Sequence, residues 1–177
     1  MYDFELRWIA FPLHPETPAE GQTLEQLFAG RPVNVREMVA HLRQVANDLD
    51  LPFGERTMTF NSRRAQELGK WAEDQGSGER FHHAVFRAYF ADGKNIGDTE
   101  VLAEVARSVG LSDRKAREVI ESRACSQAVD DDWDRSRRSG ISAVPTFRLD
   151  GQVLVGAQPI AVLEKFLLDN AVPRHGE

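Results

Sequence analysis

The chain has 177 residues, of which 41% are hydrophobic and 28% charged, and it carries a formal net charge of −6. This length suits one domain, or one domain with an insertion, and the acidic balance argues against a nucleic-acid binder, which usually presents a basic face. No apolar run approaches the roughly 20 residues of a membrane span, and the start, Met-Tyr-Asp-Phe-Glu, lacks the basic and apolar regions of a secretory signal. A single cysteine, Cys125, excludes an intramolecular disulfide and fits a reducing cytosol, so we expect a cytoplasmic protein.

The first residues predict a β-strand followed by a loop. From Tyr2 to Trp8, apolar and charged side chains alternate with the period of a half-buried strand, which we expect to span Tyr2–Phe11. Prolines follow at positions 12, 15 and 18. Because proline interrupts both helices and strand ladders, residues 12–21 are expected to form a loop.

The middle of the chain predicts helices alone. Capping residues and apolar residues at helical spacing place helices at about 23–29, 34–49, 61–76, 81–93, 98–110, 112–120 and 126–139. Thr23 with Gln26 forms a capping box for the first, and Asn61-Ser62 caps the third. The acidic run at 130–132 lacks the glycine and the alternation of a calcium loop, so we interpret it as a solvated helix face.

Near the C-terminus, Val144-Pro145-Thr146-Phe147 opens a predicted strand, hairpin, strand and helix. Proline is tolerated at the start of a strand, because its missing N–H then costs no ladder bond. Asp150-Gly151 is a two-residue hairpin signal between Thr146–Leu149 and a second apolar run at 153–155. Pro159 then stands at the favoured N1 position of a last helix. This order predicts an α/β fold with an all-helical insertion at 34–139, between core segments at 1–33 and 140–177.

Few residues can be identified as catalytic, metal-binding or ligand-binding from the sequence pattern alone. Cys125 is the one candidate thiol, and the alternative for it is a small buried hydrophobic side chain. No metal site is expected, because the five histidines have no partners at metal-binding spacing and no further cysteine is present. Asn61-Ser62 stands at a predicted helix N-terminus, where free N–H groups can hold a carboxylate, although plain capping explains the same residues.

Five segments of the chain resemble the DsbA-like thioredoxin family, in the branch of FrnE and 2-hydroxychromene-2-carboxylate isomerase. They are residues 8–21, 61–65, 86–90, 140–147 and 156–159, and their order and approximate spacing follow the family over nearly the whole chain. The resemblance implies a thioredoxin-like sheet, a cis peptide bond between Val144 and Pro145, and a Val144 backbone offered to a peptide or to glutathione. It also implies that Asn61 contacts glutathione or substrate, and glutathione is the only cofactor it suggests.

The chain departs from the family pattern at its N-terminus. Members of the family begin with a strand and a Cys-x-x-Cys or serine motif, before the strand that resembles Tyr2–Phe11, whereas this chain starts at that second strand. Either the protein has lost the segment, or the chain begins downstream of it. The missing strand would lie inside the sheet, so we expect Tyr2–Phe11 to pair in an unusual way or to pair with a second copy in a homodimer.

Three functions fit these features, and the sequence leaves all of them open. The first, which we favour, is a DsbA-family, FrnE-like thiol–disulfide oxidoreductase, expected to lack dithiol turnover because the chain has one cysteine. The second is a glutathione-dependent isomerase or transferase of the 2-hydroxychromene-2-carboxylate isomerase type. The third is a non-catalytic thioredoxin-like module that binds a peptide or protein thiol. In each, Val144, Pro145, Asn61 and Ser62 are the candidate binding residues.

Overall fold

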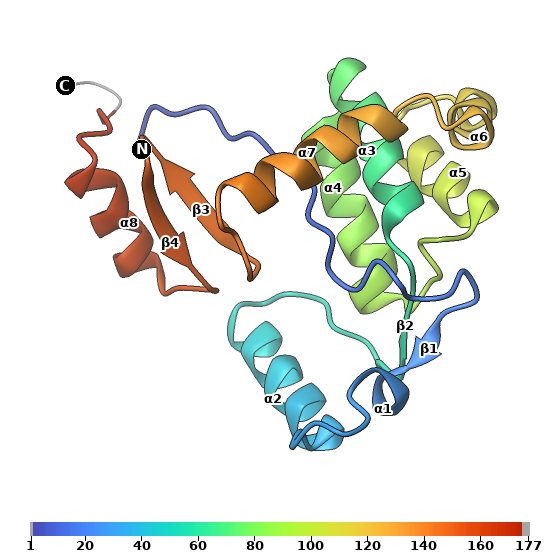
Figure 1. Cartoon of the computed structure of the whole chain (residues 1–177), viewed down its shortest axis with the longest axis horizontal. Coiled ribbons are helices and arrows are strands. Elements are labelled where there is room, and N and C mark those ends of the chain that lie inside the picture. Colours follow the sequence, from blue (N-terminus) through green and yellow to red (C-terminus); the bar gives the residue numbers. More distant parts are fainter. Residues whose placement is uncertain (1, 175–177) are drawn as a thin grey trace. The chain divides into compact units, whose positions relative to one another are not determined.

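The structure is a computed structural model that describes residues 2–174 (Figure 1). The chain divides into two compact units, which we describe separately. We call residues 12–129 the helical unit, and residues 2–11 with 130–174 the hairpin unit. The predicted boundaries of a helical insertion, at 34 and 139, stay a prediction.

The helical unit begins with two short strands, β1 (Gln22–Thr23) and β2 (Met58–Thr59), which pair antiparallel. Two helices lie between them in the sequence, α1 (Leu24–Leu27) and α2 (Val35–Asp48). The sequence does not predict these strands, because two residues carry no periodicity. Five elements follow: α3 (Arg63–Asp74), α4 (Gly78–Phe86), the π-helical turn η1 (Arg87–Ala91), α5 (Thr99–Ser108) and α6 (Asp113–Ser122). A last helix, α7 (Ser126–Arg138), continues into the hairpin unit.

The helices begin where the local sequence caps them. Thr23 and Gln26 form the predicted capping box: Thr23 Oγ1 accepts the Gln26 N–H at 3.1 Å, and Gln26 Oε1 accepts the Thr23 N–H at 2.8 Å. The side chains of Asn34, Asp98 and Ser112 accept backbone N–H groups at the starts of α2, α5 and α6. These predictions are confirmed because a cap depends only on residues within one turn.

The core of the helical unit lies among α3, α4, α5 and α6, which pack against one another. Leu68, Phe81 and Leu102 are fully buried there, one from each of α3, α4 and α5, and α6 adds Ala116 and Ile120. Within α3, the buried residues Ala65, Leu68 and Ala72 follow one another at three and four positions, the spacing of the apolar stripe of a surface helix. This packing fixes α3, and with it the residues at the start of α3 that the sequence singled out.

The hairpin unit contains the predicted antiparallel hairpin. β3 (Thr146–Leu149) pairs with β4 (Gln152–Val155), with Leu149 opposite Gln152. The two residues of the turn, Asp150 and Gly151, have φ of 45° and 87°, as a two-residue hairpin turn requires. α8 (Ile160–Asp169) follows, and Pro159 is its N-cap, one position earlier than predicted.

The prediction of a strand over Tyr2–Phe11 is wrong for most of that segment. In the described part of the chain, the one β-bridge of this segment joins Tyr2 to Arg174, antiparallel, and the Asp3 N–H donates to the Pro173 carbonyl at 2.9 Å. A strand exists through the ladder it shares with a neighbour, and alternation in the sequence cannot supply that neighbour. The bridge to Arg174 does not extend along the segment and does not join it to β3, and the expected pairing with a second copy stays a prediction.

The acidic run at 130–132 is not solvated throughout, so that interpretation is wrong for one residue. Asp132 is only 3% exposed, and its Oδ2 accepts the N–H of Ala10 at 2.9 Å. Three consecutive helical residues point about 100° apart, so a run of identical charges always places its members on different faces. Here one member turns inward and holds the end of the N-terminal segment.

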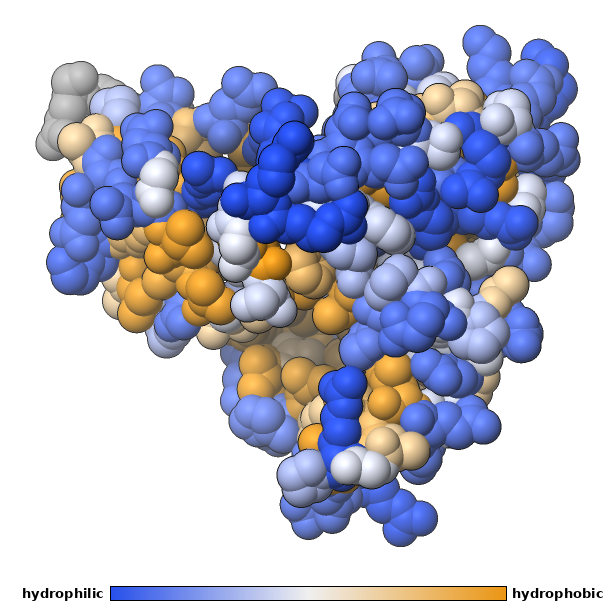
Figure 2. Space-filling view, viewed as in Figure 1, coloured by the Kyte–Doolittle hydropathy of each residue, from blue (hydrophilic) through white to orange (hydrophobic). Residues whose placement is uncertain are grey.

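Apolar side chains of the hairpin unit are only partly covered. None of the apolar residues described at 2–11 and 130–174 is fully buried. Figure 2 shows apolar side chains gathered over β4 and α8, where Val153, Val155 and Ile160 are exposed. A two-stranded hairpin is at best marginally stable by itself. The unit therefore presents apolar surface that its own elements do not cover.

Candidate functional site

In the hairpin unit, the predicted binding residues Val144 and Pro145 form the turn that enters β3. The Val144–Pro145 peptide bond is cis, the geometry that the family resemblance implies. The Pro145 carbonyl accepts the Gly156 N–H at 2.8 Å, which continues the β3–β4 ladder by one pair. Thr146 Oγ1 donates to the Ala143 carbonyl at 2.6 Å and closes the turn from its other side. These two bonds fix the backbone on both sides of Val144.

The outer edge of β3 carries unpaired backbone groups. Residues of an antiparallel strand alternate between facing one neighbour and the other, so the bond at Pro145 directs Phe147 and Leu149 toward β4. Thr146 and Arg148 therefore face away from β4, and Val144 lies in the bend just before the strand. In the part of the chain that the structure describes, their backbone N–H groups have no partner. Val144 is 42% exposed, so an extended ligand can reach this edge and bind it by hydrogen bonds.

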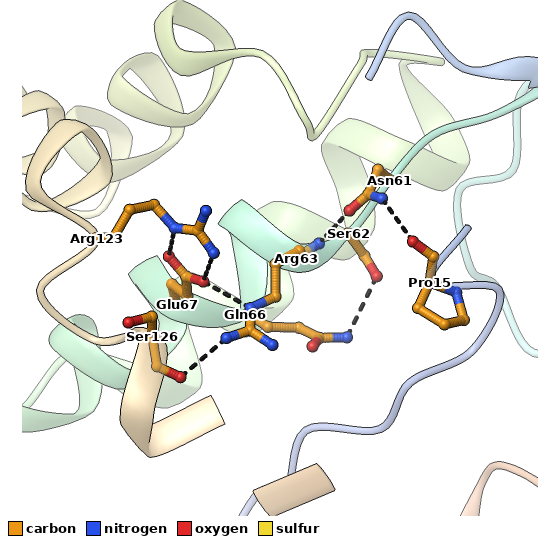
Figure 3. Close-up of polar contacts among 8 residues, drawn as sticks. All are labelled: Pro15, Asn61, Ser62, Arg63, Gln66, Glu67, Arg123 and Ser126. Carbon is orange, nitrogen blue, oxygen red and sulfur yellow. Dashed lines mark hydrogen bonds and ion pairs between the residues drawn. The ribbon is translucent and has the colours of Figure 1, made fainter. Parts of the chain in front are cut away.

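In the helical unit, Asn61 fastens the proline-rich loop to the start of α3 (Figure 3). Its Nδ2 donates to the Thr17 carbonyl at 2.8 Å and to the Pro15 carbonyl at 3.2 Å, and its Oδ1 accepts the Arg63 N–H at 2.9 Å. Every hydrogen-bonding group of the amide thus has a partner inside the chain. Asn61 precedes the N-cap residue and accepts the N–H of Arg63, the first residue of α3, while its contact with glutathione stays a prediction.

Ser62 is the N-cap residue of α3, but its side chain does not cap the helix. Its Oγ accepts a hydrogen bond from Gln66 Nε2 at 3.2 Å, one helical turn further on. The hydroxyl keeps its own proton, which it can donate to a ligand. Ser62 can therefore still donate a hydrogen bond to a ligand, whereas the groups of the Asn61 amide are already bonded within the chain.

Sequence analysis missed Asn95, which holds the same loop from a second direction. Asn95 Nδ2 donates to the Ala19 carbonyl at 3.2 Å, and Asn95 Oδ1 accepts the Gly97 N–H at 2.8 Å. Asn and Gly two residues apart are typical of a turn closed by the asparagine side chain, so the turn could have been predicted. The contact with Ala19 spans 76 positions of the chain, and no local pattern indicates it.

A buried carboxylate on α3 joins three parts of the helical unit (Figure 3). Glu67 is 1% exposed and accepts hydrogen bonds from Arg63 Nε at 2.6 Å and from two nitrogens of Arg123 at 2.6 and 2.7 Å. Arg63 also donates to the Ser126 carbonyl at 2.9 Å, at the start of α7. Burial raises the pKa of Glu67, but the hydrogen bonds from Arg123 and Arg63 outweigh it, so the net pKa lies below the ordinary value. The cluster is held ionised and links α3, the end of α6 and α7.

Cys125, the candidate thiol, is half-buried between Arg123 and Ser126. Burial raises the pKa of its thiol, and the negative charges of Asp74 and Glu67 raise it further. Only the thiolate is nucleophilic, so this environment makes Cys125 a weak nucleophile at neutral pH. The thiol suits packing better than exchange chemistry.

The described residues offer no cluster of three or more His, Cys, Asp and Glu side chains that could hold a metal ion. Of the five histidines, His175 lies outside those residues. Within the same range, no helix has both the length and the apolar composition needed to cross a bilayer. Among the binding residues that the sequence proposes, those with polar groups available to a ligand are Val144, at the edge of β3 in the hairpin unit, and Ser62, through its hydroxyl in the helical unit.

The sequence matches the model of the DSBA-like thioredoxin domain over residues 1–168, which is almost the entire chain. The chain belongs to the DsbA-like thioredoxin family. The expected fold class, an α/β thioredoxin-like fold with a large helical part, is thereby confirmed.

Solved structures of DsbA-like proteins share this fold. A probable DsbA oxidoreductase from Streptomyces coelicolor superposes with a TM-score of 0.81 at 24% identity, over 92% of this chain and 74% of that one. The cytosolic disulfide reductase DsbM from Pseudomonas aeruginosa, solved with glutathione, superposes with a TM-score of 0.57 at 21% identity, over 83% and 79% of the two chains. At these identities the likeness concerns the fold alone.

In sequence, the DsbA-like chain is 31% identical to the uncharacterized protein YwbO of Bacillus subtilis over 103 residues. That match covers 56% of this chain and 50% of YwbO, so it spans half the length of this relative.

Proposed function

We propose that the chain binds glutathione and thiol-containing peptides along the outer edge of β3, as a DsbA-family, FrnE-like protein of thiol–disulfide chemistry. The observation that supports this is the unpaired backbone at Val144, half-exposed between two fixed hydrogen bonds. An extended peptide that pairs with a sheet edge gains affinity from backbone hydrogen bonds without requiring a particular side chain. Glutathione is itself a short peptide with donors and acceptors of this kind.

The relatives support the ligand class and the compartment that we propose. DsbM is described as a cytosolic disulfide reductase and has been solved with glutathione. A cytoplasmic location for this chain agrees with its single cysteine, because disulfides are rare in that compartment. In the helical unit, the Ser62 hydroxyl at the start of α3 is a separate candidate group for a thiol ligand, with no role assumed in the β3 edge of the hairpin unit.

We propose that these 177 residues bind thiol ligands but do not catalyse repeated thiol–disulfide exchange. Thiol–disulfide exchange through a mixed disulfide needs a second thiol to release the product. The chain has only Cys125, whose pKa is raised by burial and by neighbouring carboxylates. Cys125 can form a mixed disulfide, but it has no intramolecular partner to resolve it.

The alternative proposal is a glutathione-dependent isomerase or transferase of the 2-hydroxychromene-2-carboxylate isomerase type. It is supported by the same edge at Val144, since the isomerase also needs bound glutathione. The affinity for glutathione compared with that for a cysteine peptide discriminates between the two. An isomerase prefers glutathione, whereas an oxidoreductase binds both.

Calorimetric titration of glutathione and of a short cysteine-containing peptide tests the proposed edge. Val144→Pro removes the backbone N–H, and Val144→Ala, the matched control, removes only the side chain. We expect Val144→Pro to weaken binding about tenfold, which corresponds to one lost hydrogen bond, while Val144→Ala binds as the parent does. Circular dichroism establishes that both variants fold. Equal affinities for the parent and Val144→Pro would contradict the proposed edge.

A further inference from the structure

The residues around the β3 edge carry a local excess of positive charge. The chain as a whole has a net charge of −6, but residues 135–149 contain four arginines and no acidic residue. Three of these arginines lie in the last turn of α7, and the fourth, Arg148, lies in β3. All four are exposed, and they belong to the hairpin unit, as the edge of β3 does. The charge beside this edge is therefore opposite in sign to that of the chain.

A hydrogen bond joins the basic end of α7 to β3. Arg148 Nη1 donates to Ser139 Oγ at 2.8 Å, and the Ser139 N–H donates to the Arg135 carbonyl at 3.0 Å, so Ser139 continues the helical turn. Residues three and four apart are neighbours on a helix surface, which places Arg138 and Ser139 beside Arg135. We call Arg135, Arg138 and Arg148 the arginine cluster. Figure 2 shows a strongly hydrophilic surface over this end of α7.

Carboxylates of the chain neutralise only part of the arginine cluster. Asp134 pairs with Arg137, which is not a member of the cluster. Among the described residues, the three members form no ion pair. Asp131 stands one turn before Arg135 and offsets part of its charge, but it lies about 10 Å along the helix axis from Arg138. That distance is close to the screening length at ~0.1 M salt. The cluster therefore keeps positive charge for an external partner.

Arg148 faces the position where a paired ligand places a side chain. A peptide that pairs with the outer edge of β3 sets one residue directly opposite Arg148, with its Cβ about 5 Å away on the same face of the sheet. Opposite charges at such a cross-strand position stabilise the pair, and like charges destabilise it. Arg148 thus favours an acidic residue in the ligand and disfavours a basic one.

We propose that the preferred ligand of the β3 edge is an acidic, thiol-containing peptide segment whose carboxylates lie against the arginine cluster. This inference rests on the proposed function and adds the charge and length of the ligand. From Val144 to Arg148 the edge spans five residues, so a ligand that covers it is longer than the tripeptide glutathione. Charge complementarity of this kind contributes mainly to partner selection and to the rate of association.

Titration of three peptides of equal length tests the preference for acidic ligands. Each peptide has one central cysteine, blocked ends, and alanine alternating with glutamate, glutamine or lysine. We expect the glutamate peptide to bind about tenfold more tightly than the lysine peptide at low salt, with the glutamine peptide between them. In ~0.5 M salt the difference should fall below about threefold, because salt screens exposed charges.

Arginine variants locate the preference in the protein. Arg148→Gln and Arg138→Gln should each weaken binding of the glutamate peptide about threefold and leave the glutamine peptide unchanged. Lys165→Gln is the matched control, because it removes the same charge from an exposed site on α8 of the same unit, and all three peptides should bind it as they bind the parent. Arg138 also favours the C-terminus of α7 through the helix dipole, but a loss of helix stability alone would weaken both peptides alike.

The outcomes separate this inference from the proposed function. If all three peptides bind with equal affinity and Val144→Pro weakens them, the edge binds peptides and the acidic preference is wrong. If no peptide binds at millimolar concentration, the proposed function fails together with this inference. Weakening of the glutamate peptide by Lys165→Gln as much as by Arg148→Gln would assign the effect to net charge and overturn the proposed cluster.

Discussion

At the scale of single residues, two side-chain amides and one buried carboxylate join segments of the helical unit that lie far apart in the sequence. Asn61 and Asn95 bind carbonyls of the proline-rich loop, and Glu67 binds two guanidinium groups. Arg123 reaches Glu67 from a left-handed backbone conformation, with φ of 55°, at the C-cap of α6. A residue other than glycine is disfavoured there, so its charged bond to Glu67 helps to hold the conformation.

Replacing Glu67 by Gln tests this cluster. The substitution keeps the shape but removes the charge that both guanidinium groups share, so we expect the free energy of unfolding to fall by about 1–3 kcal/mol. Glu118→Gln is the matched control, because Glu118 pairs with Arg114 at an exposed site, where a pair contributes at most about 1 kcal/mol. Denaturant unfolding of the three proteins gives both values. Equal stability of Glu67→Gln and Glu118→Gln would show that the buried cluster contributes nothing.

The difference in unfolding free energy between the parent and Glu67→Gln should also depend on pH, in a direction set by the pKa of Glu67. Because the pKa of folded Glu67 lies below its ordinary value, its contribution is complete above the ordinary glutamate pKa of about 4.3. That contribution is lost as the pH falls through the lower, folded value. The stability difference between the parent and Glu67→Gln should therefore be largest at neutral pH and shrink in acid. A difference that grows as the pH falls would contradict the ionised cluster.

At the scale of elements, the sequence predicts what depends on neighbours along the chain. The capping box at Thr23, the helix starts predicted at 98 and 112 and the turn at Asp150-Gly151 all appear as expected, because each depends on a few neighbouring residues. The strand at Tyr2–Phe11 fails because pairing needs a partner from elsewhere. The predicted helix at 81–93 is divided into α4 and the π-helical turn η1, which the apolar spacing does not distinguish from a continuous helix.

The proline-rich loop provides a prediction at this scale. Asn61→Ala removes both side-chain donors to the loop and the cap on α3, so we expect faster amide exchange in a peptide spanning residues 13–21 and a loss of about 1–2 kcal/mol in stability. Asn47→Ala, on the exposed surface of α2, is the control. Hydrogen-exchange mass spectrometry measures both. Unchanged exchange over residues 13–21 in Asn61→Ala would mean that the loop is held by other contacts.

At the scale of the whole molecule, the chain is a DsbA-like thioredoxin domain. Its candidate binding groups are the backbone at Val144 and the side-chain hydroxyl of Ser62. Family resemblance identifies the Val144–Pro145 turn from four residues, because proline and the hairpin that follows are local signals. It does not identify Asp132 or Asn95, whose partners lie 122 and 76 positions away. The free edge at Val144 likewise emerges only from the alternation of the β3–β4 ladder.

The most direct test of the proposed binding edge is a titration of isotopically labelled protein with glutathione, followed by NMR at the backbone amides. Thr146 and Arg148 have N–H groups on the outer edge of β3, Val144 has an unpaired N–H just before the strand, and Phe147 and Leu149 face β4. We predict that the amides of the first three residues shift together on saturation, and that those of Phe147 and Leu149 shift less. Saturable binding that leaves Val144 and Thr146 unchanged, or no binding at millimolar glutathione, would contradict the account.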